Sequence, residues 1–173
     1  MSTDCPKRLG AFTLVELLIV IMVLIIAAAI VIPNIGSAAD AQAMSAARVL
    51  ACDLEVARDL ALKTRCPHTM LFSSDRQSYK VVADYGEESY AAADEIDHPV
   101  VAGRTFEVTL AERNGMRAVS VVDVSFGGDD YVTFNELGEP SSAGSMTVQA
   151  GDTQIRIAVT GLTGSVSTAR VSD

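Results

Sequence analysis

One apolar run near the N-terminus constrains this chain more than any other feature. It extends from Phe12 to Ile32 and contains a single charged residue, Glu16. At about 1.5 Å per residue, a helix of this length spans roughly 30 Å, the thickness of a bilayer core. A carboxylate in such a segment costs on the order of 2.5–3.5 kcal/mol at the bilayer centre and less near an end. The run contains no basic residue that could pair with Glu16, so the acid requires a partner from outside the helix.

The apolar run has three interpretations. The first is a secretory signal, because Lys7 and Arg8 form a short basic region and Ala27–Ala29 matches an A-x-A cleavage site. The acid near the start of the run, and the apolar residues that continue to Ile32, count against a signal. The second is a plain membrane anchor, in which the two basic residues hold the N-terminus in the cytoplasm. The third interpretation depends on the residues that surround Glu16.

The segment Leu9–Ile21 reads LGAFTLVELLIVI. It closely resembles the class III leader junction of type IV pilins and type II secretion pseudopilins. In that family a short basic leader is cut just before a Phe, and the new N-terminus is methylated. A cut between Ala11 and Phe12 places Glu16 at the fifth mature position, where the family has a glutamate. The same cut places Pro33 at the twenty-second position, where the family often has a helix-kinking proline.

The residue before this cut departs from the family pattern. Glycine is usual there, whereas this chain has Ala11. A cut between Gly10 and Ala11 restores the glycine but moves Glu16 and Pro33 out of register together. We therefore predict cleavage between Ala11 and Phe12 and methylation of Phe12.

The resemblance also implies a partner for Glu16. In the family this acid pairs with the free N-terminal amine of a neighbouring subunit that enters the filament. A buried carboxylate without a partner is costly, and an ammonium from the next chain relieves that cost. The alternative is a glutamate near the membrane interface that reaches toward the headgroups.

The residues after the apolar run predict a second helix. Pro33 should kink or end the first helix, because proline removes a backbone donor. Beyond it, apolar residues recur at spacings of three and four and form one stripe: Ala43, Ala47, Leu50, Leu54, Ala57 and Ala61. Asp59 and Lys63 form an i,i+4 pair, and Cys66-Pro67 ends the helix. The alanine-rich stripe predicts close packing against a sheet or another helix.

From His68 onward the hydrophobic period changes to two, which predicts small antiparallel strands. The expected elements are a hairpin of 68–73 with 78–84, a hairpin of 145–150 with 153–159, and short strands at 131–134 and around Val166. The acidic segment around Glu87–Asp97 is expected to form a short helix or a loop. We also expect Thr105–Leu110 to pair with Ala118–Phe126, because the Asn-Gly dipeptide between them is a strong turn signal.

These elements predict an α+β, pilin-like fold with a small antiparallel sheet packed on a long helix. The expected organisation is a leader at 1–11, a transmembrane helix at 12–33, an amphipathic stalk helix at 34–66 and a β-rich periplasmic domain at 67–173. Toward the C-terminus, Phe134–Gly138 forms a Phe-x-x-x-Gly turn, Gly144 leads a strand, and Gly164–Val166 has Ser in place of Arg in a Gly-Arg-Val-like ending. This order resembles the H-type minor pseudopilins and the related FimT-like minor pilins.

The soluble part suggests little chemistry. His68 and His98 have no obvious partner in the sequence, and no nucleophile motif or phosphate-binding glycine motif is present. Gly127–Asp130 could form a cation loop, but a solvated acidic turn is the preferred interpretation. Cys52 and Cys66 are expected to be unpaired thiols. We predict no catalytic residue, no metal site and no cofactor, and therefore no enzymatic activity.

The charge of the chain limits its partners. The formal net charge is −9, and removal of residues 1–11 takes away two basic residues and one acidic residue, which gives −10. Such a chain lacks a dominant phosphate-binding surface, so nucleic acid is not an expected partner, although FimT-like relatives in DNA-uptake pili bind DNA.

The sequence thus predicts a minor pseudopilin of a type II secretion system. It would cross the inner membrane once, with a cytoplasmic N-terminus and a periplasmic C-terminal domain. The implied partners are the prepilin peptidase, other pseudopilins, the inner-membrane assembly platform, and the secretin or secreted substrates. Two alternatives stay open: a minor pilin of a type IV pilus, acting in assembly priming or DNA uptake, and a membrane-anchored periplasmic binding domain that does not polymerise.

Overall fold

The computed structural model describes residues 12–31, 34–83, 94–113 and 115–171. These residues belong to two units, one that ends at Ser37 and one that begins at Ala38. The first unit contains helix α1, Leu14–Val31. No helix within the described residues is both long enough and apolar enough to cross a membrane. Of the predicted N-terminal positions, Gly10, Ala11 and Pro33 lie outside the described residues.

Helix α2, Asn34–Thr64, supplies the predicted apolar stripe. All six predicted stripe residues, from Ala43 to Ala61, are fully buried. On the exposed side, Lys63 Nζ lies 3.9 Å from Asp59 Oδ2, as the i,i+4 spacing predicts. The helix ends one residue before Arg65, whose φ of 54° is the left-handed conformation that commonly terminates helices. The stripe and the end before Cys66 are therefore confirmed.

Within the described residues, the first sheet has five antiparallel strands. They are β1 His68–Phe72, β2 Ser78–Ala83, β3 Asp94–Glu95, β4 Glu107–Thr109 and β6 Tyr131–Phe134. The order is β3-β2-β1-β6, and β4 also pairs with β2. The predicted hairpin of β1 and β2 is confirmed, with Met70 opposite Val81. Residues 94–95 of the acidic segment form β3, and residues 84–93 lie outside the described part.

The second sheet has four antiparallel strands. They are β5 Val119–Phe126, β7 Gly144–Ala150, β8 Thr153–Val159 and β9 Val166–Arg170. Their order is β5-β7-β8-β9. The predicted β7–β8 hairpin is confirmed, with Val148 opposite Ile155. The expected single small sheet is thus two sheets in the structure.

One predicted pairing is wrong. The segments Thr105–Leu110 and Ala118–Phe126 do not pair, because β4 pairs with β2 and β5 pairs with β7. Between them the chain forms a 3-10 helix, η1 Leu110–Glu112, and β5 belongs to the second sheet. The turn signal at Gly115 describes only a local bend, whereas the burial of Phe106 and Val108 decides which partner β4 takes.

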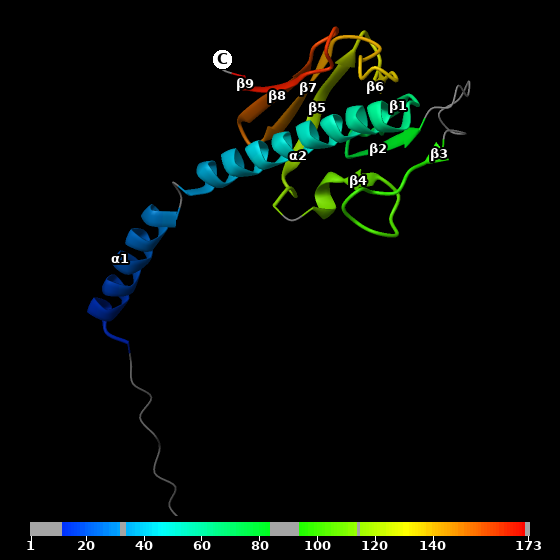
Figure 1. Ribbon diagram of the computed structural model, residues 1–173. Coiled ribbons are helices and arrows are strands. Elements are labelled where there is room, and N and C mark those ends of the chain that lie inside the picture. The colour runs from blue at the N-terminus through cyan, green and yellow to red at the C-terminus, as the bar shows by residue number, and fades with distance from the viewer. Residues whose placement is uncertain (1–11, 32–33, 84–93, 114, 172–173) are drawn as a thin grey trace, which may run out of the picture. The chain divides into compact units, whose positions relative to one another are not determined.

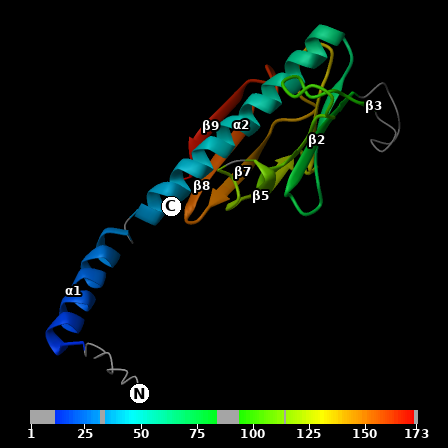
Figure 2. The same cartoon turned by 90° about the horizontal axis from the view of Figure 1, so that it is seen from below.

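Helix α2 lies against both sheets (Figures 1 and 2). One core joins the helix stripe to the inner faces of the strands, and its largest buried side chains include Tyr79, Phe106, Phe126 and Phe134. Alanines on the helix allow the strands to approach closely, which is why a helix with few large residues can carry this core. Residues 98–113, in the described part of the segment between β2 and β5, lie beside the helix and form the cavity described next.

Candidate functional site

The predicted N-terminal site residues lie at the start of α1. Phe12 precedes the helix and is 76% exposed, and Glu16 lies in the first turn. The backbone N–H of Glu16 donates to Thr13 Oγ1 at 3.2 Å, so Thr13 caps the helix. Thr13 and Glu16 have the spacing of a capping box, a signal that the sequence reading missed. Among the described residues, the Glu16 carboxylate has no hydrogen-bond or ion-pair partner.

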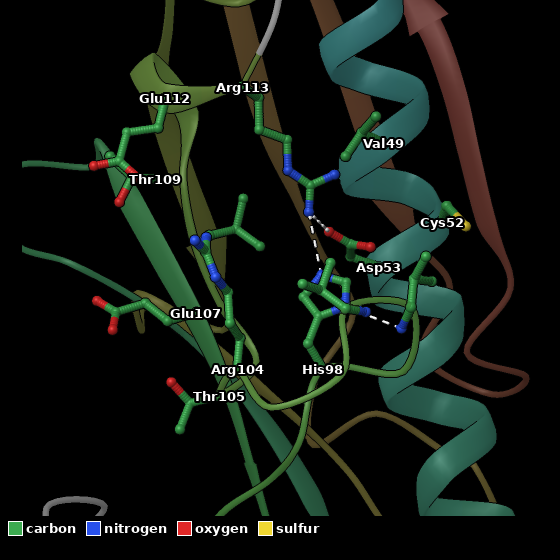
Figure 3. A pocket seen from close by; sticks show the side chains of 13 residues that line it. Val49, Cys52, Asp53, His98, Arg104, Thr105, Glu107, Thr109, Glu112 and Arg113 are labelled. Atoms are coloured by element: carbon green, nitrogen blue, oxygen red, sulfur yellow. Dashed lines mark hydrogen bonds and ion pairs between the residues drawn. The ribbon is translucent and has the colours of Figure 1, made fainter.

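The second unit contains a cavity of about 400 Å³ between α2 and the segment 98–113 (Figure 3). Val49 and Asp53 of α2 form one wall. His98 and Arg113 approach Asp53, and Arg104 lines the cavity with them. Its lining combines four valines with acidic, basic and hydroxyl side chains, so the cavity is more polar than a typical small-molecule pocket.

Asp53 is the buried charge of this cavity, with only 8% of its surface exposed. The Tyr79 hydroxyl donates a hydrogen bond to Asp53 Oδ2. Arg113 Nη2 lies 3.8 Å from the same oxygen. Burial raises the pKa of Asp53, and the Tyr79 hydrogen bond and the nearby Arg113 and His98 oppose that rise. The hydrogen bond between Tyr79 and Asp53 joins β2 to α2 and is well shielded from water.

Tyr79 is fixed as the donor in this pair. Burial raises its pKa well above 10, and the neighbouring Asp53 charge raises the pKa further. The phenol therefore stays protonated across the physiological range and is unsuited to act as a base. The Tyr79–Asp53 pair is a structural contact at the floor of the cavity.

His98 lies beside this pair. Its Nδ1 accepts hydrogen bonds from the backbone N–H groups of Val100 and Val101, at 3.1 and 3.3 Å. Its ring centroid is 4.7 Å from that of Phe106. Its Nε2 is 3.4 Å from Arg113 Nη2 (Figure 3). The other histidine, His68, is buried in β1 and contacts the Cys66 carbonyl.

The structure describes no group of three or more residues that could hold a metal ion. The Gly127–Asp130 segment is the turn between β5 and β6, with positive φ at both glycines. Arg76 Nη2 lies 3.8 Å from Asp130 Oδ1, so this acidic turn already has a cation partner. Cys52 and Cys66 are free thiols, as expected.

The sequence reading missed Asp53, Tyr79 and Arg113 as a cluster. One signal could have found the first of them: Asp53 is three residues after Leu50 and four before Ala57, so it lies on the apolar face of the helix. Its partners come from β2 and from the loop after η1, and no spacing along the chain joins them.

The fold of the second unit is also found in solved structures of other proteins. The second unit packs two antiparallel sheets on one long helix. The same fold occurs in the minor pseudopilin EpsH from the type II secretion system of Vibrio cholerae, with a TM-score of 0.57 at 12% identity, over 76% of this chain and 99% of that one. It also occurs in the type IV minor pilin FimU of Pseudomonas aeruginosa, with a TM-score of 0.51 at 14% identity, over 75% and 90%. No curated protein matches the sequence.

The family follows from the sequence itself. Residues 46–164 match the family described as Type II transport protein GspH. The chain belongs to this family, the minor pseudopilins of type II secretion. The predicted family is therefore confirmed, by a match that includes the Phe134–Gly138 turn and begins after the leader motif.

Proposed function

We propose that this minor pseudopilin is processed at its N-terminus and assembles into a periplasmic filament. A prepilin peptidase cuts between Ala11 and Phe12 and methylates the new amine on Phe12. The apolar run from Phe12 to Ile32 anchors the protein in the inner membrane before assembly, with the β-rich unit in the periplasm. In the filament, Glu16 pairs with the amine of a neighbouring pseudopilin.

Glu16 carries this proposal. It is the one charged residue of the apolar run, and no residue in the described part of the chain balances its charge. The hydrogen bond to Thr13 at the helix start uses the Glu16 backbone N–H and not its carboxylate. An N-terminal amine four residues ahead on an adjacent, axially shifted chain is a cation of the right chemistry.

Mass spectrometry of the protein purified from its native membrane tests this proposal. The expected N-terminus is methylated Phe12. A chain that retains Met1, or one that begins at Ile30 after cleavage by a signal peptidase, contradicts the filament assignment. In a separate assay, protease is added from the periplasmic side of the membrane. Protection of the β-rich domain from this protease would contradict the proposed topology.

The likeness to FimU favours a second candidate, a minor pilin of a type IV pilus. A strain that lacks this protein separates the two functions. Loss of protein secretion with intact surface pili supports the pseudopilin function. Loss of surface pili with intact secretion supports the pilin function.

A further inference from the structure

We infer that the free edge of strand β9 binds an extended segment of a partner protein, which adds an antiparallel strand to the second sheet. β9, Val166–Arg170, comes last in the order β5-β7-β8-β9, so β8 pairs with only one of its edges. An unpaired strand edge presents N–H and C=O groups at a fixed spacing, and another extended backbone is the ligand that matches it.

The hydrogen bonds with β8 show which backbone groups of β9 are free. The Val171 N–H, one residue past the strand, donates to the Gln154 carbonyl at 3.0 Å. Backbone groups point to alternate edges along an antiparallel strand, so every second residue of β9 faces away from β8. These residues are Val166, Thr168 and Arg170. Their N–H and C=O groups form the row that an added strand would pair with.

Two other strand edges of the described structure are covered. Beyond β6, the Ser141 N–H donates to the Thr133 carbonyl at 2.7 Å, so the chain itself closes that edge. At β5, the Arg76 side chain donates to the Val122 carbonyl at 2.9 Å, beside a register shift in that strand. β9 has neither protection, because Ser167–Arg170 are all exposed and its ladder with β8 is regular. Open, regular edges are where strand addition occurs.

The direction of β9 argues against a second copy of this chain as the added strand. The strand begins near the end of α2, where a Cβ on Gly164 would lie 3.1 Å from Arg58 Nε, and it ends where Arg170 Nη2 lies 3.4 Å from Asp40 Oδ2. β9 therefore runs antiparallel to α2 (Figure 2). Two copies joined antiparallel through β9 would have opposed α2 helices, and the apolar runs that precede α2 would leave at opposite ends. This exclusion depends on the proposed membrane anchor.

The face of β9 toward α2 favours apolar side chains on the added strand. Thr168 lies opposite Ile157, which is fully buried, yet Thr168 itself is exposed. The cover over the sheet thus ends between β8 and β9. Met44, one turn after Asp40 in α2, is 39% exposed. Apolar side chains on an added strand would extend the core to these residues.

The outer face favours an acidic side chain between the apolar ones. One row across the sheet joins Asp123 of β5, Thr147, Arg156 and Ala169. Arg156 is exposed and has no ion-pair partner in the part of the chain that the structure describes, because Thr147 separates it from Asp123. Ala169 is small, so the Arg156 side chain can reach over it toward the next strand. A carboxylate opposite Ala169 would pair with Arg156.

The test uses the peptide acetyl-Thr-Val-Glu-Val-Thr-amide, which has this pattern, and the full ¹⁵N-labelled chain in detergent micelles. The expected result is a saturable NMR shift and slower hydrogen exchange of the Thr168 and Arg170 amides, with the amides of β5 unchanged. Two matched peptides each carry one N-methyl group. Methylation of the second valine removes an N–H that faces β9 and should weaken binding about tenfold. Methylation of the glutamate removes an N–H that faces away and should leave binding unchanged.

Two variants at one position complete the test. Thr168→Pro removes the outward N–H, and Thr168→Ala keeps it. Proline is tolerated on an edge strand where the N–H faces solvent, so both variants should fold, as the other amide resonances will show. Thr168→Pro should weaken peptide binding about tenfold, and Thr168→Ala should not weaken it.

Three results would overturn the inference: unmoved Thr168 and Arg170 signals, equal binding of the two methylated peptides, or full affinity in a folded Thr168→Pro. Protection of Thr168 that rises with protein concentration, without peptide, would also overturn it and would assign the edge to a second copy. These measurements require neither leader cleavage nor assembly, so a failed filament assay with intact peptide binding would reject the proposed function alone.

Discussion

The two helices of this chain carry apolar residues in different ways. In α1 the large apolar side chains are exposed, as Leu18 at 52% and Leu24 at 61% illustrate. In α2 the apolar residues form one stripe, and Leu50 and Leu54 are fully buried. The sheets of the same chain cover α2. The exposed apolar surface of α1 is what the proposed membrane anchor and filament contact would cover.

The largest expected effect tests this difference directly. Leu54→Ala should lower the free energy of unfolding of the second unit by about 2–5 kcal/mol, because it leaves a cavity under the sheets. Leu18→Ala, the same change in α1, should alter that free energy by less than about 0.5 kcal/mol. Guanidinium unfolding in micelles, followed by near-ultraviolet circular dichroism, measures both. Similar losses in the two variants would show that α1 is part of the folded core.

Two glycines of the second unit differ in how closely other atoms approach them. Gly164 and Gly103 both have positive φ, 61° and 74°. A Cβ on Gly164 would lie 2.4 Å from the Gly138 carbonyl oxygen, whereas a Cβ on Gly103 would meet nothing within 4 Å. Both alanine variants bear the left-handed strain, but only Gly164→Ala adds a clash, worth roughly 1–3 kcal/mol more. Equal thermal stability of the two variants would contradict close packing of the loops beside α2.

The smallest effect is a pH dependence at the cavity. Burial raises the pKa of Asp53 above 3.8, so the folded protein holds this proton more tightly than the unfolded chain does. Stability contributed by Asp53 is therefore lost as the pH rises from 3.8 through the raised pKa. Relative to Asp53→Asn, which has no proton to lose, the wild type should become less stable over that window. The measurement is the free energy of unfolding of both proteins from pH 3.5 to 8.

The sequence predicted local elements well. The α2 stripe and the β7–β8 hairpin each follow from a period that is complete within one segment. The pairing of Thr105–Leu110 with Ala118–Phe126 was wrong because strand partners depend on contacts far apart in sequence. The short strand β4 pairs with β2, with Val108 opposite Tyr79. Tyr79 lies outside residues 105–126, so no pattern within that segment predicts this pairing.

The N-terminal leader site and the cavity beside α2 also differ in how far apart their residues lie in the sequence. The leader motif is one continuous segment, so roles for Phe12 and Glu16 could be proposed from the sequence. The cavity brings together Asp53, His98 and Arg113 from three segments that only the fold makes adjacent. Asp53 on an apolar helix face was a visible anomaly, but its partners were not predictable without the register of β2.

In-cell crosslinking of pseudopilins tests whether Glu16 makes the assembly contact. We expect Glu16→Ala to be inserted and cleaved normally but to be lost from crosslinked filament species. Thr13→Ala, which removes the helix cap and keeps the carboxylate, is the matched control and should still be incorporated. Normal incorporation of Glu16→Ala would show that Glu16 is not the assembly contact.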